Sequence, residues 1–275
     1  MKVKPFDKYL MRQSCAVLSI IGVIATILLL FEDGQCGFKM IVGISSVSVF
    51  FSIYFFMLIY ANLKTKATLR INSSTIEIKT GDIFAEDGLK VISFNEYFDT
   101  IVDDVLISNN SLNGKFICKY LSDVNKLDEH IKENRRLSQN IFNVNDSRIY
   151  GKKTRYKLGS ACIYDDYVLT AFSRFDVDNR AYLYIRDYIR FLLKFWEELD
   201  IIYSGRDVVI PIFGSGIMTR LKGNEHITDQ ELLEIILWSF KVSGFTTKSQ
   251  AKLVLIIGEK NLPNVNLHRL KHFIN

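Results

Sequence analysis

Residues 81–100 read GDIFAEDGLKVISFNEYFDT and contain the pattern that decides the fold. The apolar run KVISFN, residues 90–95, is typical of a short buried strand, and turn-forming residues flank it on both sides. A second run of this kind, DVVIPIFGSG at 207–216, leads directly into two glycines. Both runs predict buried strands, one ending at Asn95 in a polar loop and the other in a glycine-rich loop.

The remainder of the sequence after residue 62 alternates strand-like and helix-like segments. It predicts a hairpin at 68–79, strands on either side of an Asp165-Asp166 turn and at 251–258, and helices at 111–121, 123–137, 180–199, 228–244 and 266–274. The segment 123–137 is so polar that we expect an exposed helix. Thr228 and Glu231 have the spacing of a capping box, and Gly244 stands at the C-terminal position of the same helix.

Alternating strands and helices predict a mixed or largely parallel sheet with helices on both faces, which is an α/β domain. Ligands of such domains bind beyond the carboxyl ends of the strands. We therefore expect the loop after Asn95 and the loop at 213–216 to leave the same edge of one sheet. The first offers polar side chains, and the second offers backbone N–H groups that suit a phosphate or diphosphate.

Two charge-free apolar runs occupy residues 14–31 and 40–61, separated by a short polar turn. Each has about the length that an α-helix needs to cross a ~30 Å hydrocarbon core. A signal peptide is the alternative for the first run, but no small-residue cleavage site ends it and a second run follows. We expect an N-terminal segment at 1–13, a transmembrane hairpin at 14–61 and a globular domain at 62–275.

Basic residues on both sides of this hairpin predict its orientation. Lys2, Lys4, Lys8 and Arg12 precede it, and Lys64, Lys66 and Arg70 follow it. By the positive-inside rule, both termini and the globular domain face the cytoplasm of a multi-pass protein in the cell membrane. The spans carry no ionisable residue of the kind that marks an ion path. Their small residues would allow close helix packing, inside one hairpin or between subunits: Gly22, Ala25, Gly43, Ser45, Ser46, Ser48 and Ser52.

Composition argues against several other functions. The net charge of +5 is dispersed, whereas nucleic acid as a partner calls for a basic stripe or patch. Cys15, Cys36, Cys118 and Cys162 have no metal-ligand spacing, and their scatter fits reduced thiols better than a disulfide framework. The four histidines are isolated, so we expect no metal site.

The order of the motifs resembles that of macro domains, α/β modules that bind ADP-ribose. The motifs are GDIF at 81–84, the strand that ends in Asn95, and PIFGSGI at 211–217. The resemblance implies that the Asp82 carboxylate contacts the adenine amine, that Asn95 faces the distal ribose, and that the glycine-rich loop holds the diphosphate. The candidate ligand-binding residues are Asp82, Ile83, Asn95, Glu96, Asp99, Phe213, Gly214, Ser215, Gly216 and Ile217.

Four further segments are informative: KVISFNEYFDT at 90–100, SLNGKF at 111–116, YKLGSA at 156–161 and LTAFSRFD at 169–176. Together with the two-span N-terminus, they resemble the macro-domain effectors of Thoeris anti-phage defence over essentially the whole chain. In that family a TIR-domain partner makes a nucleotide signal, the macro domain senses it, and the membrane part executes the response. The resemblance implies an ADP-ribose-type nucleotide as ligand, no cofactor, contact with membrane lipid, and a homo-oligomer on activation.

One departure bears on catalysis. Many macro-domain hydrolases carry Asn-Ala-Ala-Asn followed by a run of glycines, whereas this chain has NEYFD at 95–99. The departure favours a non-enzymatic receptor, with a ligand decorated at the distal ribose and no catalytic residue. A membrane-anchored ADP-ribosyl hydrolase or nucleotide-processing enzyme and a passive scaffold are the alternatives. Each site residue also has a structural alternative: Asp82 could cap a turn, Asn95 and Asp99 could stabilise their own loop, and the glycines could form a plain strand-to-helix turn.

Overall fold

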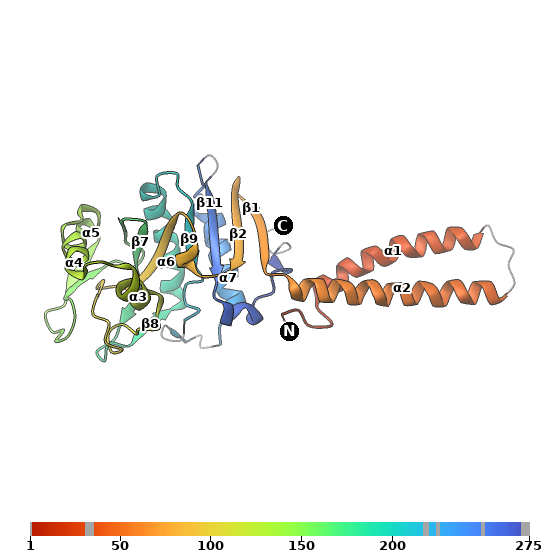
Figure 1. Cartoon of the computed structure of the whole chain (residues 1–275), viewed down its shortest axis with the longest axis horizontal. Coiled ribbons are helices and arrows are strands. Elements are labelled where there is room, and N and C mark those ends of the chain that lie inside the picture. Colours follow the sequence, from red (N-terminus) through yellow and green to blue (C-terminus); the bar gives the residue numbers. More distant parts are fainter. Residues whose placement is uncertain (1, 31–35, 217–219, 224–225, 249–250, 271–275) are drawn as a thin grey trace. The chain divides into compact units, whose positions relative to one another are not determined.

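The computed structural model describes residues 2–30, 36–216, 220–223, 226–248 and 251–270. These residues belong to two units (Figure 1). One unit is Thr68–Asn264, and the other is Met1–Ala67 together with Val265–Asn275. The expected domain start at residue 62 differs from this division, because helix α2 continues to Leu63 and the C-terminal segment belongs to the helical unit.

The helical unit contains α1 (Lys8–Leu30) and α2 (Cys36–Leu63). Within them, Lys8–Ile27 and Lys39–Leu63 are long and apolar enough to cross a membrane. Many of their large apolar side chains point outward, including Ile20, Val23, Met40, Ile41, Phe51 and Phe55. An apolar surface of this extent is unusual for a protein in water and is typical of a membrane or protein contact. The expected spans fall within these helices, except for residue 31, which lies outside the described residues.

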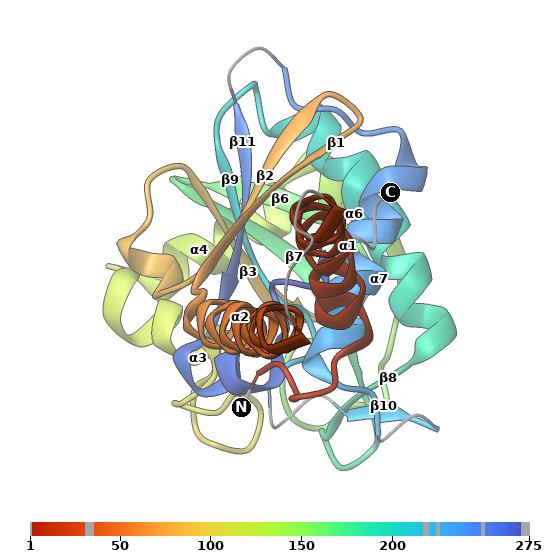
Figure 2. The same cartoon turned by 90° about the vertical axis from the view of Figure 1, so that its right-hand side faces the viewer.

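The second unit is built on a nine-stranded sheet in the order β1-β2-β11-β9-β3-β7-β8-β10, with β6 paired to β7. The strands are β1 (Lys66–Ile71), β2 (Ser74–Thr80), β3 (Leu89–Asn95), β6 (Ala161–Tyr164), β7 (Tyr167–Phe175), β8 (Ala181–Tyr184), β9 (Val208–Pro211), β10 (Arg220–Lys222) and β11 (Lys252–Ile257). Strands β2, β11, β9, β3 and β7 are neighbours and run parallel to one another (Figure 2). Strands β4 (Ile141–Val144) and β5 (Thr154–Tyr156) form a separate antiparallel pair.

Two predicted turns are confirmed. Strands β1 and β2 are joined by Asn72 and Ser73, whose φ values of 49° and 66° are the pair of positive values that a type I′ hairpin turn requires. Asp165, with a φ of 51°, turns the chain between the antiparallel strands β6 and β7. The Asp165-Asp166 pair therefore serves a turn, as expected.

Short and long helices connect the strands. They are η1 (Ile83–Ala85), α3 (Leu112–Lys115), η2 (Phe116–Tyr120), α4 (Val124–Glu133), α5 (Arg135–Gln139), α6 (Ile185–Ile202), α7 (Asp229–Ser243) and η3 (Glu259–Asn264). The capping box at the start of α7 is confirmed, because the Thr228 and Glu231 side chains bond each other's backbone N–H groups. Gly244 ends the helix in the left-handed conformation, with a φ of 73°.

Two helix predictions are wrong in part. The segment 123–137 is not one exposed helix: Asn134 leaves the helical conformation and caps α5, and both helices bury apolar residues against the sheet. The segment 180–199 does not start as a helix, because Ala181–Tyr184 pairs with β7 and β10. Of the expected helix at 266–274, residues 267–269 form a turn, and residues beyond 270 lie outside the described part.

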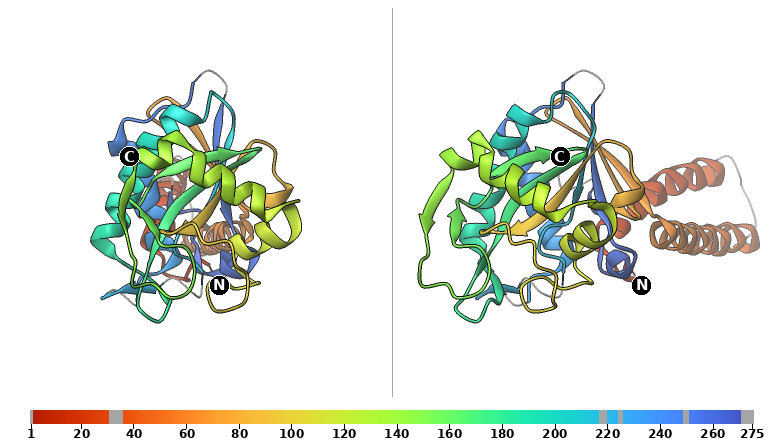
Figure 3. Two further views of the ribbon diagram at one scale, coloured as in Figure 1. Left: turned by 90° about the vertical axis from the view of Figure 1, so that its left-hand side faces the viewer. Right: turned by 60° about the vertical axis from the view of Figure 1, so that its left-hand side comes forward.

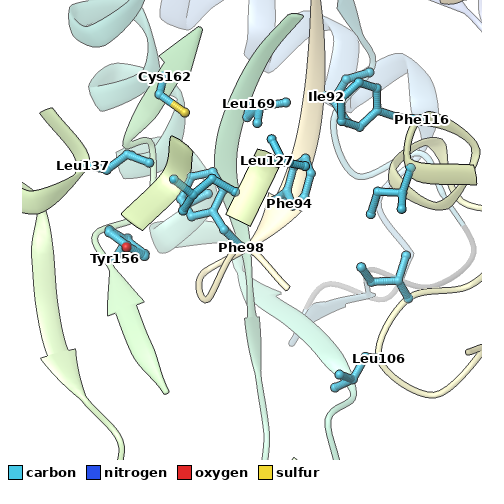
Figure 4. Packing of buried hydrophobic residues seen from close by; sticks show 14 residues of the cluster. Ile92, Phe94, Phe98, Leu106, Phe116, Leu127, Leu137, Tyr156, Cys162 and Leu169 are labelled. Carbon is cyan, nitrogen blue, oxygen red and sulfur yellow. The ribbon is translucent and has the colours of Figure 1, made fainter. Parts of the chain in front are cut away.

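Helices cover both faces of the sheet, as predicted. On one face, Ile92 and Phe94 of β3 and Leu169 of β7 pack with residues of η2, α4, α5 and β5 (Figure 4). On the other face, Phe172 of β7 packs against Phe191 of α6, with ring centroids 4.9 Å apart. Neighbouring residues of a strand point to opposite faces, so the two sets belong to different layers. Figure 3 shows α4 and α5 in yellow-green and α6 in teal on opposite sides of the sheet.

Candidate functional site

Four neighbouring parallel strands deliver their following loops to one edge of the sheet. Strand β2 leads into the Asp82 turn and η1, β3 into residues 95–99, β9 into residues 212–216, and β11 into η3. The predicted meeting of the Asn95 loop and the glycine-rich loop at a common edge is therefore confirmed. Edges of this kind are where open α/β sheets bind their ligands.

Asp82 caps the short helix η1 and remains exposed. Its Oδ1 accepts a hydrogen bond from the Phe84 backbone N at 3.1 Å. One oxygen of the Asp82 carboxylate therefore caps η1, as the structural alternative predicts. The carboxylate still faces solvent and can accept a further hydrogen bond. The side chain of Ile83 is buried against Val209, Val254 and Ile256 and so belongs to the core.

The loop after β9 has a buried start and an exposed end. The ring of Phe213 is buried, with its centroid 5.0 Å from that of Phe191, so its side chain belongs to the core and cannot be a surface contact for a ligand. Ser215 N and Oγ both donate to the Ile212 carbonyl, at 3.3 and 2.8 Å. Gly214 has a φ of +84°, and the Cβ position of Gly216 has open space around it. Residues 214–216 therefore present backbone at the sheet edge, whereas Ile217 lies outside the described residues.

Asn95 is buried and organises its own loop. Its Oδ1 accepts from the backbone N–H groups of Tyr97 and Asp99, at 2.9 and 3.3 Å. Its Nδ2 donates to Asp99 Oδ2 at 3.0 Å. These contacts agree with the alternative in which Asn95 stabilises its own loop. They engage both the oxygen and the nitrogen of the side-chain amide, which the resemblance to macro domains predicts to face a ribose.

Asp99 is fully buried and forms a salt bridge with Arg148. Arg148 Nη2 donates to Oδ2 at 2.7 Å, Nη1 donates to Oδ1 at 3.2 Å, and the Lys152 backbone N donates to Oδ1 at 2.7 Å. The guanidinium also lies 3.8 Å from the centroid of the Tyr97 ring. Asp99 thus joins the segment 148–152 to the loop after β3, and the arginine compensates the charge that burial would otherwise make costly.

Glu96 is held in a second buried cluster. Its Oε2 accepts from Arg155 Nη2 at 2.8 Å and from Arg174 Nη1 at 3.5 Å, and its Oε1 accepts from the Phe175 backbone N at 3.2 Å. The sequence analysis did not identify these arginines or Arg148 as parts of the site. Arg148 stands in the polar segment NDSRIYGKK, whose composition indicates only an exposed loop.

Asn113 is another residue that the sequence analysis did not identify as part of the site. It lies in α3 and is 7% exposed, and its Oδ1 has no hydrogen-bond partner among the described residues. The preceding residue, Leu112, packs against the apolar cluster that contains Ile83, Val209, Val254 and Ile256. A buried acceptor without a partner costs about 1–3 kcal/mol, so a ligand hydroxyl or amine that reached it would remove this cost.

Cys162 is the buried thiol of this unit and is a poor nucleophile. Burial raises the pKa of Cys162 to about 12, so the neutral thiol predominates at physiological pH. The other cysteine of this unit, Cys118, is exposed on η2 and donates weakly to Asn109 Oδ1 at 3.7 Å.

Comparison with known proteins identifies the family. Residues 76–258 match the family model described as Thoeris protein ThsA, Macro domain. The chain is 36% identical over 276 residues to the Thoeris protein ThsA of Bacillus amyloliquefaciens (strain Y2), covering 97% of this chain and 90% of that protein.

Solved structures of the Oceanobacillus iheyensis macrodomain are similar in fold. A point mutant of that protein has a TM-score of 0.50 at 13% identity, covering 77% of this chain and 98% of that chain. The form with MES bound has a TM-score of 0.48 at 15% identity, covering 76% of this chain and 97% of that chain. With the fold and the family match together, the chain belongs to the ThsA family of Thoeris anti-phage defence proteins and carries their macro domain.

Proposed function

We propose that the chain is a membrane-bound receptor-effector that senses an ADP-ribose-type nucleotide with its macro domain and acts on the membrane through α1 and α2. The observation that carries the proposal is the meeting of the exposed Asp82 turn and the Gly214–Gly216 backbone at one sheet edge, in a chain with two long apolar helices. The signal would be a diffusible nucleotide made by a TIR-domain partner of the same defence system.

Three groups at the edge fit such a ligand. The Asp82 carboxylate can accept a hydrogen bond from the exocyclic amine of adenine. The backbone of this loop, which is half-buried at Gly214 and Ser215 and exposed at Gly216, suits a diphosphate, because backbone N–H groups bind anions without a side chain. Asn113 Oδ1 offers a buried acceptor to a hydroxyl or amine of the ligand. No cofactor is required for recognition of this kind.

The side chains around the loop after β3 favour a receptor over the hydrolase alternative. A general acid or base must exchange a proton with the substrate. Glu96 and Asp99 instead hold buried salt bridges with arginines, and both ends of the Asn95 amide are bonded inside the loop. The neutral thiol of Cys162 is also unsuited to attack. We therefore assign no catalytic residue.

Assembly in the membrane is the proposed output, with both termini in the cytoplasm and the hairpin in the cell membrane. A ligand shifts an assembly equilibrium only if it binds the assembled form more tightly. The hydroxyls of Ser45, Ser46 and Ser52 donate to carbonyls within α2, at 2.7, 2.8 and 2.9 Å. Because these hydroxyls are satisfied within their own helix, their small side chains leave room for close approach of a neighbouring helix. Such packing between subunits would disrupt the membrane.

The test uses the full-length protein in detergent micelles with ADP-ribose and derivatives substituted at the distal ribose. Calorimetry follows binding, chromatography follows turnover, and light scattering follows particle mass. We expect binding of at least one derivative, no product, and an increase in mass. Product formation would favour the hydrolase, and a constant mass at saturating ligand would overturn the assembly mechanism.

A further inference from the structure

The first residues of the chain are folded against the base of α2. The Val3 backbone N donates to Asn62 Oδ1 at 3.0 Å, and Asn62 Nδ2 donates back to the Val3 carbonyl at 3.2 Å. Lys2 Nζ donates to the Lys64 carbonyl at 2.9 Å, and the Tyr54 hydroxyl donates to the Pro5 carbonyl. One asparagine side chain thus holds both backbone groups of Val3, as a neighbouring strand would.

Apolar contacts and a helix cap also hold this N-terminal segment. Val3 and Leu10 are buried together with Leu58 and Ala61 of α2. Asp7 Oδ1 accepts from the backbone N–H groups of Tyr9 and Leu10, at 3.0 and 3.1 Å. Asp7 Oδ2 accepts from Asn266 Nδ2 at 3.3 Å. The segment is therefore held in one conformation before any partner binds, which lowers the entropic cost of binding.

The side chains that this arrangement leaves outside are basic and aromatic. Lys4, Phe6, Lys8 and Arg12 are all exposed, and 82% of Phe6 is accessible. On the adjacent part of α2, 72% of Tyr60 is accessible. Asp7 carries the one side-chain carboxylate among the described residues of the helical unit; it caps the start of α1 and accepts a hydrogen bond from Asn266.

We propose that this surface, the juxtamembrane platform of residues 2–12, binds the headgroups of anionic phospholipids. The inference rests on the proposed function, because α1 and α2 must span the membrane for the platform to lie at its surface. Basic residues at that level attract anionic headgroups, and aromatic side chains settle at the boundary between headgroups and acyl chains. The partner is a lipid surface because the platform continues directly into an apolar helix, on which a soluble anion would find no further contact.

The direct experiment compares lipids with identical acyl chains. Full-length protein in detergent is incubated with phosphatidylglycerol or phosphatidylcholine, and native mass spectrometry counts the retained lipids. The wild-type protein should retain phosphatidylglycerol in preference, and this preference should decline as salt rises. At low salt, the combined variant Lys4→Gln, Lys8→Gln and Arg12→Gln should lose about fivefold in preference for each charge removed.

Matched variants separate the platform from net charge. The combined variant Lys126→Gln, Lys132→Gln and Lys157→Gln removes the same charge from exposed positions of the macro domain and should keep the wild-type preference. Asn62→Leu keeps every charge but removes the hydrogen bonds that hold Val3, so its preference for phosphatidylglycerol should also decline. Equal retention of both lipids by the wild type, or equal behaviour of the two combined variants, would overturn the proposal.

Two further measurements are needed. One distinguishes a lipid headgroup from free phosphate as the ligand of the platform, and the other separates failure of the platform proposal from failure of the proposed nucleotide binding. Inorganic phosphate at millimolar concentration should leave the retained phosphatidylglycerol unchanged, and displacement would reduce the platform to a general anion site. Nucleotide binding is measured by calorimetry on the same platform variant. A platform variant that binds nucleotide but has lost its lipid preference agrees with both hypotheses and shows that the two sites are separate. A wild-type protein that prefers phosphatidylglycerol but binds no nucleotide contradicts the proposed function alone.

Discussion

Removing the arginine of the buried Asp99–Arg148 pair should strongly destabilise the macro domain. The two side chains are 1% and 6% exposed, so Arg148→Met leaves the Asp99 carboxylate charged, buried and without its ion partner. Breaking a pair of this kind typically costs about 3–5 kcal/mol. A domain of this size loses about 2–4 °C in melting temperature for each kcal/mol, which predicts a decrease of about 6–20 °C.

Intrinsic fluorescence can follow this transition selectively. The chain has two tryptophans, Trp196 and Trp238, and both lie in the macro-domain unit. Arg206→Met is a matched control, because Arg206 pairs with Asp166 at the surface, where the two side chains are 43% and 64% exposed. Exposed pairs contribute about 0–1 kcal/mol, so the control should shift the melting temperature by less than about 4 °C.

A double variant tests the assigned cause. Asp99→Asn added to Arg148→Met removes the buried charge while keeping an acceptor, and it should recover about 1–3 kcal/mol of the lost stability. The reasoning fails if Arg148→Met melts no lower than the surface control, or if the double variant is no more stable than the single one.

Three further predictions concern the ligand edge and the thiols. Asp82→Ala should weaken nucleotide binding by about 1.5–3 kcal/mol and abolish the preference for adenine over hypoxanthine, whereas Asp82→Asn should keep the cap of η1. Calorimetry on both variants measures these affinities, and an equal loss for both bases would indicate that Asp82 only stabilises the turn. Gly216→Val should preserve the melting temperature, because a Cβ at this position meets open space, but it should lower nucleotide affinity at least tenfold by obstructing the backbone N–H groups. Unchanged affinity would show that this loop is not part of the site. Gly214 is less suitable for this test, because its φ of +84° strains any side chain. Maleimide at pH 7.5 should modify Cys118 and leave Cys162 unmodified until the protein unfolds, since a pKa of about 12 leaves Cys162 almost no thiolate. Peptide mapping identifies the modified cysteine, and modification of Cys162 in the folded protein would contradict this prediction.

Local sequence signals predicted the elements that depend on neighbours in the chain. The capping box of α7, the Asp165 turn and the strands that end at Asn95 and Pro211 each have a residue pattern within a few positions. The Asn134 break between α4 and α5 also had a local signal, because asparagine is a preferred helix cap. Because segment 123–137 is highly charged, it was predicted as one exposed helix, and neither the Asn134 cap nor the buried apolar residues were identified.

Long-range partners could not be read in the same way. Glu96 and Asp99 look like free polar groups at a strand end, and only the folded chain brings Arg148, Arg155 and Arg174 against them. The residues Ala181–Tyr184 suit either a strand or a helix, and pairing with β7 and β10 decides the outcome. The orphan acceptor of Asn113 likewise follows from packing that composition does not encode.

Because the helical unit contains residues both before Thr68 and after Asn264, the macro domain is joined to it through two peptide connections. Isolating it as a soluble fragment therefore takes two cuts, near Thr68 and near Asn264. A fragment that extends beyond Asn264 retains Val265, Leu267 and Leu270, which are almost completely buried in the intact chain. Because these residues belong to the helical unit, Thr68–Asn264 rather than a longer fragment is the unit to express when the macro domain is studied alone.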